Sequence, residues 1–330
     1  MNLPLPDSYD PDRFGTFYAA RKEQLAEEAA EFAEQHDISP AKHDRTKRAM
    51  FGIDCQIDFC FDDEAEQTGA LAVPGALEDM QTAVEFMYRN LDQISGLQFS
   101  MDTHRVFQIF HAAFWEDEDG NHPDPMTTIT TEDLDAGHWR PVANPTLARE
   151  YVEKIDASDQ YTLTIWPYHT LLGDLGHALV PPVFEAAVFH SVARSHQTHL
   201  ETKGTKTMTE HFSVLEPEVK ELGGLGIGHF STDFYETLLN YDKVGIFGEA
   251  SSHCVRETLK SLRQKIQKDD PSLADKIYVF EDCMSPVEPP PLDPLPEALN
   301  FPKQAQKTLE ESEKFGFNVV TTENPGDFLD

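Results

Sequence analysis

The feature that most constrains this fold is the alternation of short apolar runs, several of which end in polar residues, with amphipathic helical segments. The segments expected to contain strands are 48–59, 96–104, 161–169, the start of 242–266, 275–283 and 315–322. The segments expected to be helical between them are 75–94, 180–197 and the end of 242–266. Runs that are apolar throughout are typical of strands covered on both faces, and strands that alternate with helices form parallel sheets. We therefore expect an α/β fold with a mostly parallel sheet and helices on both faces.

Three segments lie outside this alternation. Residues 1–47 are polar overall, but 21–37 carries apolar residues at helical spacing, so we expect an N-terminal helical extension that packs on the main body or on a neighbouring subunit. The main domain is expected over 48–330, with an irregular insertion or lid at about 105–160, where NHPDP and ANP are turn sequences. The proline-rich segment 286–296 is expected to be extended, and a short helix should precede the last strand.

The charge balance restricts the partners. The 26 basic and 59 acidic residues give a net charge of −33, which argues against nucleic acid and against anionic membrane surfaces, since both are bound through basic patches. Four cysteines without a CxxC pair indicate a reduced, intracellular protein. We see no signal-peptide pattern and no apolar stretch near the ~20 residues of a membrane span, and expect a cytoplasmic protein.

One cysteine stands at a position suited to nucleophilic catalysis. Cys254 follows an expected strand and begins an expected helix, in the sequence GIFGEASSHCVRETLKSL. A thiolate there is stabilised by the helix N-terminus, and the free backbone N–H groups can hold the oxyanion of a tetrahedral intermediate. This segment alone leaves open a buried structural cysteine, which is the commoner role of a lone cysteine.

Two further residues have the chemistry to assist a cysteine. Asp54 ends the first expected strand, and a carboxylate beside a thiol can accept its proton and pass it to a leaving amine. Lys203 precedes a glycine, and a buried ammonium beside a thiol lowers the pKa of that thiol. Taken alone, Asp54 can equally be a cap or an ion-pair partner, and Lys203 can equally be an exposed lysine.

A third group of residues has the composition of a metal site. Asp102 and His104 are two positions apart, so in an extended strand their side chains point to the same side and can reach one divalent ion. His169, in IWPYH, can complete a site of two histidines and one carboxylate. With 14 histidines in the chain, a chance DxH pair and a hydrogen-bonded loop histidine are the alternatives.

Together these segments resemble the nicotinamidase branch of the isochorismatase-like cysteine hydrolases. The resemblance rests on five motifs in order, namely D-x-Q-x-D-F at 54–59, D-x-H at 102–104, W-P-x-H at 166–169, K-G at 203–204 and G-x-A-x-x-x-C-V at 248–255. It covers about 48–104, 161–215 and 242–287, and implies the Rossmann-like sheet of the isochorismatase-like hydrolase fold.

The resemblance also implies an activity, hydrolysis of nicotinamide to nicotinate and ammonia through a thioester. It implies a catalytic triad of Asp54, Lys203 and Cys254. The oxyanion hole would consist of the N–H groups of Ala250 and Cys254, with a cis peptide bond between Glu249 and Ala250.

The resemblance further implies a metal cofactor, expected to be zinc, with iron or manganese as alternatives. Its ligands would be Asp102, His104 and His169, and the metal would bind the pyridine nitrogen and orient the ring. The aromatic side chains of Phe59 and Trp166 would pack against that ring.

Two motifs and the insertion depart from the family pattern. The usual D-W-H-P is D-T-H-R here, and the usual W-P-x-H-C is W-P-Y-H-T, but neither change removes a ligand. The insertion lies between two of the metal-ligand segments, so it can reshape the mouth of the pocket, and its His111, His122 and His138 can approach the metal. The identity of the substrate therefore stays open. The alternatives are a metal-free carbamoyl or ureido amidohydrolase and a catalytically idle binding protein on the same fold. An isochorismatase proper is disfavoured because it does not use the nucleophilic cysteine.

Overall fold

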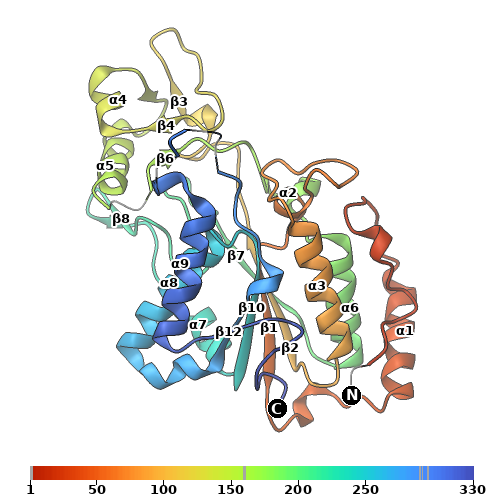
Figure 1. The fold of residues 1–330 in the computed structure, drawn as a ribbon. Helices are drawn as coiled ribbons and strands as arrows, with labels where there is room; N and C mark the ends of the chain where they lie inside the picture. The colour runs from red at the N-terminus through yellow and green to blue at the C-terminus, as the bar shows by residue number, and fades with distance from the viewer. Residues whose placement is uncertain (1–2, 159–160, 290, 292, 296) are drawn as a thin grey trace.

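A six-stranded parallel sheet forms the centre of the molecule. The computed structural model describes residues 3–158, 161–289, 291, 293–295 and 297–330. The strands of the sheet are β1 (Arg48–Ile53), β2 (Gly96–Asp102), β7 (His199–Lys203), β10 (Lys243–Gly248), β11 (Ile277–Phe280) and β12 (Asn318–Val320). Their order is β12-β11-β10-β1-β2-β7, and every neighbouring pair is parallel, which confirms the expected sheet (Figure 1).

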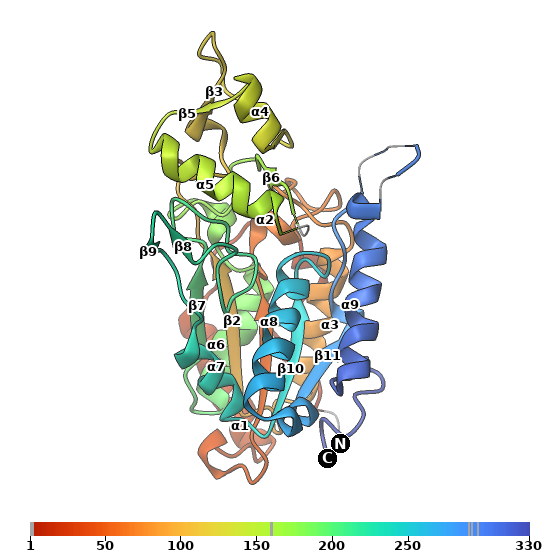
Figure 2. The same ribbon diagram turned by 90° about the vertical axis from the view of Figure 1, so that its left-hand side faces the viewer.

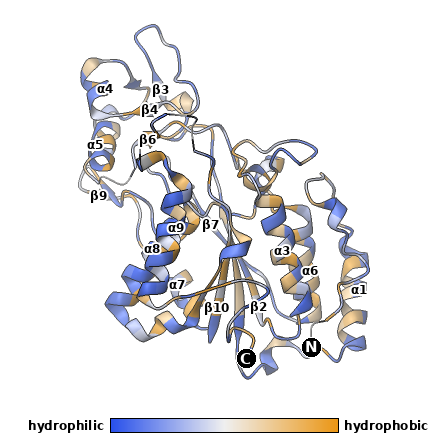
Figure 3. Ribbon diagram, viewed as in Figure 1, coloured by the Kyte–Doolittle hydropathy of each residue, from blue (hydrophilic) through white to orange (hydrophobic). Residues whose placement is uncertain are grey.

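Helices cover both faces of this sheet (Figures 1 and 2). One face carries α1 (Lys22–Gln35), α3 (Ala76–Arg89) and α6 (Pro181–Ala193), and the other carries α7 (Thr232–Leu239), α8 (Cys254–Asp269) and α9 (Phe301–Phe315). The strands β1 and β2 are buried along their whole length, and Figure 3 shows the hydrophobic residues of the sheet between helices of mixed hydropathy. None of the described helices is long and apolar enough to cross a bilayer.

The N-terminal helix α1 packs on α6 of the same chain and buries Leu25, Ala29 and Phe32. The helix before β12 is longer than the sequence suggested, since α9 has 15 residues. The proline-rich segment 286–296 lies partly outside the described residues. The remaining short elements are α2 (Ile57–Cys60), the hairpin β8 (Glu221–Leu222) and β9 (Leu225–Gly226), and 3-10 turns at Pro11–Arg13, Ala41–His43, Ala112–Phe114, Leu175–His177, Pro271–Lys276, Glu281–Cys283 and Glu297–Leu299.

The expectation of an irregular insertion at 105–160 was wrong, because this segment is folded. It contains α4 (Thr131–Ala136) and α5 (Pro145–Asp156), and the short strands β3 (Trp115–Glu116), β4 (Thr128–Ile129) and β5 (Arg140–Pro141). Trp115 and Tyr151 are fully buried in a third core, separate from the two cores that flank the sheet, and Leu163 and Leu222 from outside the segment complete it. Asn144 and Pro145 do not form a turn as expected; Pro145 is the first residue of α5, where the missing N–H costs nothing.

The expected strand at 161–169 was also wrong. Only Leu163 and Thr164 form a strand, β6, and it pairs with β4 outside the central sheet. The place beside β2 belongs to β7, whose sequence HLETK is polar because it lies at the edge of the sheet and exposes its first residues. Residues 165–169 instead form a loop over the carboxyl end of the sheet, which is how Trp166 and His169 reach the same place as the strand ends.

Candidate active site

The strand order places a crevice at the carboxyl ends of β1 and β10. From β1 the chain adds β2 and β7 on one side and β10, β11 and β12 on the other, so the order reverses between β1 and β10. In open parallel sheets, ligands bind outside the carboxyl ends of the strands at such a switch point. Asp54 follows β1 and Cys254 follows β10, so both residues lie at this crevice.

The three expected catalytic residues meet here. The Lys203 ammonium nitrogen Nζ lies 2.9 Å from Asp54 Oδ2 and 3.5 Å from Cys254 Sγ. All three residues are buried, and Asp54 adopts a left-handed backbone conformation (φ 49°) where the chain leaves β1. Ser100 fixes the other carboxylate oxygen, because its hydroxyl donates to Asp54 Oδ1 at 2.6 Å. The carboxylate, the ammonium and the thiol therefore form one buried, hydrogen-bonded group.

The electrostatics of this group favour a neutral thiol at rest. Burial raises the pKa of the Cys254 thiol well above its usual value, and the Lys203 ammonium only partly opposes this. Burial also raises the pKa of Asp54, against the lowering effect of Lys203. Burial alone would lower the pKa of Lys203, but the Asp102 and Asp54 carboxylates outweigh it and raise that pKa, so the ammonium stays charged. A buried thiol beside a basic carboxylate needs that carboxylate to accept its proton before it can attack.

The backbone around Cys254 offers two free donors. The peptide bond between Glu249 and Ala250 is cis, as expected. Within the described residues, neither the Ala250 N–H nor the Cys254 N–H donates a hydrogen bond, and Cys254 is the first residue of the 16-residue helix α8. Unpaired N–H groups at a helix N-terminus attract negative charge. These two N–H groups can therefore hold an oxyanion beside the thiol.

The three expected metal ligands are also together. One ligand atom from each of Asp102, His104 and His169 lies within 4.8 Å of the other two, and all three residues are buried. Asp102 joins this cluster to the group of Asp54, Lys203 and Cys254, since its Oδ1 lies 3.2 Å from Lys203 Nζ and its Oδ2 lies 2.9 Å from His104 Nε2. Burial acts to raise the pKa of Asp102, but His104 and Lys203 outweigh burial and hold that pKa well below its usual value.

The hydrogen bonds of these histidines fit a cation. His169 Nδ1 lies 2.7 Å from the Pro167 carbonyl and His104 Nδ1 lies 3.2 Å from the Gly204 carbonyl. A carbonyl only accepts, so both Nδ1 atoms carry the proton and both Nε2 atoms present a lone pair in the neutral rings. In that state the lone pair of His104 Nε2 faces the Asp102 carboxylate oxygen Oδ2. Two acceptors this close need a proton or a metal ion between them. One carboxylate and two imidazoles suit zinc, iron or manganese.

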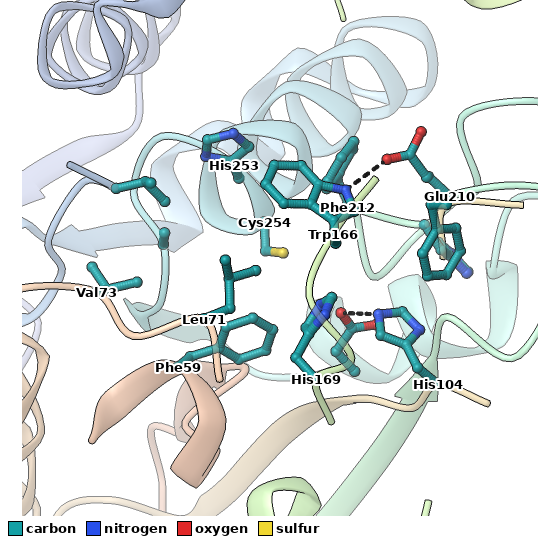
Figure 4. A pocket seen from close by; sticks show the side chains of 15 residues that line it. Phe59, Leu71, Val73, His104, Trp166, His169, Glu210, Phe212, His253 and Cys254 are labelled. Atoms are coloured by element: carbon teal, nitrogen blue, oxygen red, sulfur yellow. Dashed lines mark hydrogen bonds and ion pairs between the residues drawn. The ribbon is translucent and has the colours of Figure 1, made fainter. Parts of the chain in front are cut away.

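Aromatic side chains line the pocket above these residues. Phe59, from α2, and Trp166 lie on opposite sides of it, and Cys254 points into the space between them with His104 and His169 nearby (Figure 4). The rest of the wall is mainly apolar and includes Leu71, Val73, Phe110, Phe212, His253 and Val287. An apolar pocket with few polar groups suits a small, flat, uncharged ligand.

Several residues of this site were not predicted from the sequence. Ser100 lies two positions before Asp102 on β2, so the two-residue period of a strand would have found it. Gln56 receives the Asp102 N–H at 2.6 Å and donates to the Asp102 carbonyl, which fixes this strand end against β1. Glu210 accepts the Trp166 indole N–H at 3.0 Å (Figure 4), and nothing in its local sequence indicates this.

Of the three histidines in the 105–160 segment, one approaches the metal ligands. The His111 ring is buried, its centroid lies 5.7 Å from that of His104, and its Nε2 has no partner among the described residues. His122 instead contacts the Trp115 carbonyl, and His138 is exposed beside Asp133. The folded segment thus contributes a side chain to the surroundings of the site.

Comparison with known proteins identifies the fold. No protein-family model matches the chain, and no curated protein matches it in sequence. Among solved structures, the yeast nicotinamidase Pnc1p bound to the inhibitor nicotinaldehyde is similar, with a TM-score of 0.52 and 19% identity over 83% of this chain and 99% of that one. A nicotinamidase/pyrazinamidase from Acinetobacter baumanii gives a TM-score of 0.52 and 15% identity over 86% and 99%. The chain therefore has the fold of these nicotinamidases.

Proposed function

We propose that this protein is a cysteine-dependent amidohydrolase and that its substrate is nicotinamide or a closely similar heteroaromatic amide. The observation that carries the proposal is the buried contact of Lys203 with both Asp54 and Cys254. A carboxylate, an ammonium and a thiol in contact form an activated nucleophile with its own base, and a structural ion pair has no need of the thiol. The nicotinamidase fold supports the same reaction class.

The proposed reaction begins with the transfer of the Cys254 thiol proton to Asp54. The thiolate attacks the amide carbon, and the N–H groups of Ala250 and Cys254 hold the oxyanion. The carbon–nitrogen bond then breaks, Asp54 gives its proton to the departing ammonia, and a thioester remains on Cys254. Asp54 next accepts a proton from water, which attacks the thioester and releases the acid and the thiol. Lys203 stays protonated throughout and limits the build-up of negative charge.

Asp102, His104 and His169 would hold a divalent metal ion, most simply zinc. When bound, such an ion would supply a Lewis acid for a ring nitrogen of the substrate. Phe59 and Trp166 would stack on the ring, and Glu210 holds the indole of Trp166 in place. A neutral amide is also the appropriate substrate for a protein with a net charge of −33, which repels anions. The cytoplasm is the compartment that four free cysteines favour.

An ammonia-release assay tests the substrate. Nicotinamide, pyrazinamide and ureido compounds are compared with and without a chelator, on protein whose metal content has been measured. We expect turnover of the two heteroaromatic amides and loss of that turnover after chelation. Turnover of a ureido compound alone, unaffected by chelator, would replace the nicotinamide proposal with the metal-free amidohydrolase. Turnover of none of them would favour the binding-protein alternative.

The metal site gives a separate prediction about binding. Replacing His169 with alanine removes one of three ligands, and we expect the zinc bound per chain after dialysis to fall from about one to a small fraction, because losing one ligand of a three-ligand site leaves too few. Native mass spectrometry measures the bound metal. His138→Ala is the matched control, since His138 is exposed and belongs to no such group. Undiminished zinc in His169→Ala would show that this cluster is not the metal site.

A further inference from the structure

Two buried carboxyl groups face each other behind the segment that carries the proposed oxyanion donors. Asp79 lies on the buried side of α3, and Glu249 immediately follows β10. The Asp79 and Glu249 side chains lie within hydrogen-bonding reach of each other. Counted as carboxylates, however, Asp79 Oδ2 and Glu249 Oε1 have no donor within the described residues. Two carboxylates cannot hydrogen-bond to each other, so this contact needs a proton on one of the two groups.

The surroundings of this pair favour a proton over a metal ion. The largest charge effects on the pair, beyond those of its own two members, come from the acidic side chains Asp62, Glu78 and Asp282. The thiols of Cys55, Cys60 and Cys283 nearby are neutral because burial raises their pKa values. Among the described residues, the pair belongs to no group of three ligand atoms close enough for a metal ion. Burial raises the pKa of Glu249 well above its usual value and that of Asp79 to about 6.

This pair is tied to the backbone on both sides of Ala250. Glu249 Oε2 accepts the Ser285 N–H at 3.2 Å, and the Ser251 N–H donates to the Ser285 carbonyl at 2.9 Å. Ala250, the residue between them, carries one of the two free N–H groups of the site. The position of that N–H therefore depends on the Glu249 side chain, and Asp79 holds the Glu249 side chain from the other side.

We propose that Asp79 and Glu249 share one proton and that this acid–carboxylate pair positions the Ala250 N–H for the oxyanion. Loss of the proton leaves two adjacent buried carboxylates, which repel each other and displace the Glu249 side chain together with the backbone it holds. The pair does not contact the reacting atoms, so both are positioning residues. Their effect on turnover rests on the amidase function proposed above, whereas the shared proton does not.

The shared proton can be observed without substrate. At neutral pH, the infrared difference spectrum between wild type and Glu249→Gln should contain the carbonyl stretch of a protonated carboxylic acid. Asp79→Asn should lose the same band, because an amide in either position donates to the remaining carboxylate and removes the need for a proton. Glu78→Gln, which changes the neighbouring acid on α3, should keep it. The absence of this band from wild type would overturn the proposal, whatever the protein hydrolyses.

The pH dependence of turnover tests the positioning role. As the pH rises, wild-type kcat should fall about tenfold per pH unit once the pair loses its proton, with little change in KM. Glu249→Gln and Asp79→Asn should both lack this alkaline fall, since an amide does not ionise, and Glu78→Gln should retain it. An alkaline fall that is identical in wild type and both amide variants would overturn the role. If no substrate is found, the amidase proposal fails while the infrared result still stands.

The stability of wild type provides a further check. The folded chain binds the shared proton more tightly than the unfolded chain, because the carboxyl pKa values are raised on folding. Its free energy of unfolding should therefore fall as the pH rises through these values. This fall should be smaller in Asp79→Asn and Glu249→Gln than in wild type. Equal slopes in chemical denaturation at several pH values would contradict the shared proton.

Discussion

Replacing Cys254 with serine is expected to lower kcat for the amide substrate by roughly 10³-fold or more, the usual size of losing a nucleophile. Serine keeps the shape of the side chain and can still contact Lys203. Its hydroxyl, however, is a far weaker acid than a thiol, and Asp54 is too weak a base to deprotonate it. The loss should appear in kcat, while binding of the ring between Phe59 and Trp166 changes little. Ammonia release under saturating substrate measures the effect.

Two observations complete this test. Wild type quenched during turnover should carry the acyl group on the peptide that contains Cys254, which mass spectrometry detects, and Cys254→Ser should not. Cys283→Ala is the matched control, because Cys283 is also buried but lies outside the pocket walls. Full activity in Cys254→Ser, or an acyl group on another residue, would remove Cys254 from the mechanism.

The central sheet was predictable from the alternation of apolar runs and helical segments, whereas the full set of site residues was implied by the resemblance of five ordered motifs to a known family. Side chains at the carboxyl ends of parallel strands share one edge of the sheet. Asp54, Asp102 and Cys254 each stand at the end of an apolar run or just beyond it, and the observed strand order explains why they meet. The period of two in a strand likewise put Asp102 and His104 on one side.

The errors arose where local sequence and tertiary position disagree. The strand β7 is polar because it lies at the edge of the sheet, so its five residues lack the apolar run that marks a central strand. The segment 105–160 was expected to be irregular because Asn144 and Pro145 resemble a turn, although they begin α5. The core it joins contains residues far apart in the chain, such as Ile129 and Leu163, which pair across β4 and β6, and no local pattern reveals this.

The pair of Asp79 and Glu249 shows the same limit more sharply. Asp79 is buried on the apolar side of α3, where the helical pattern predicts a hydrophobic residue and gives no reason for an acid. Its partner Glu249 is 170 positions later in the chain, directly after the strand β10. Only the folded structure brings these two acids, each unfavourable to bury alone, into contact.

Replacing Lys203 with methionine is expected to have the second large effect, and on two properties at once. Lys203 is the cation that contacts both the Asp54 and the Asp102 carboxylates, and it is fully buried. Removing one partner of a buried ion pair leaves uncompensated charge, and the free energy of unfolding should fall by about 3–5 kcal/mol. Turnover should fall by roughly 10³-fold, because the developing negative charge loses its cation.

A double variant separates these two effects. Adding Asp54→Asn to Lys203→Met removes one of the two carboxylates that lose this cation, so much of the lost stability should return, as chemical denaturation can measure. Activity should not return, because the base is then missing as well. Lys206→Met is the matched control, since Lys206 is an exposed lysine three positions away and should change neither property. If Lys203→Met kept its activity, Lys203 would not belong to the catalytic group, whatever its effect on stability. Activity that returned together with stability in the double variant would assign Lys203 a purely structural role, because the reaction would then proceed without either the ammonium or the base.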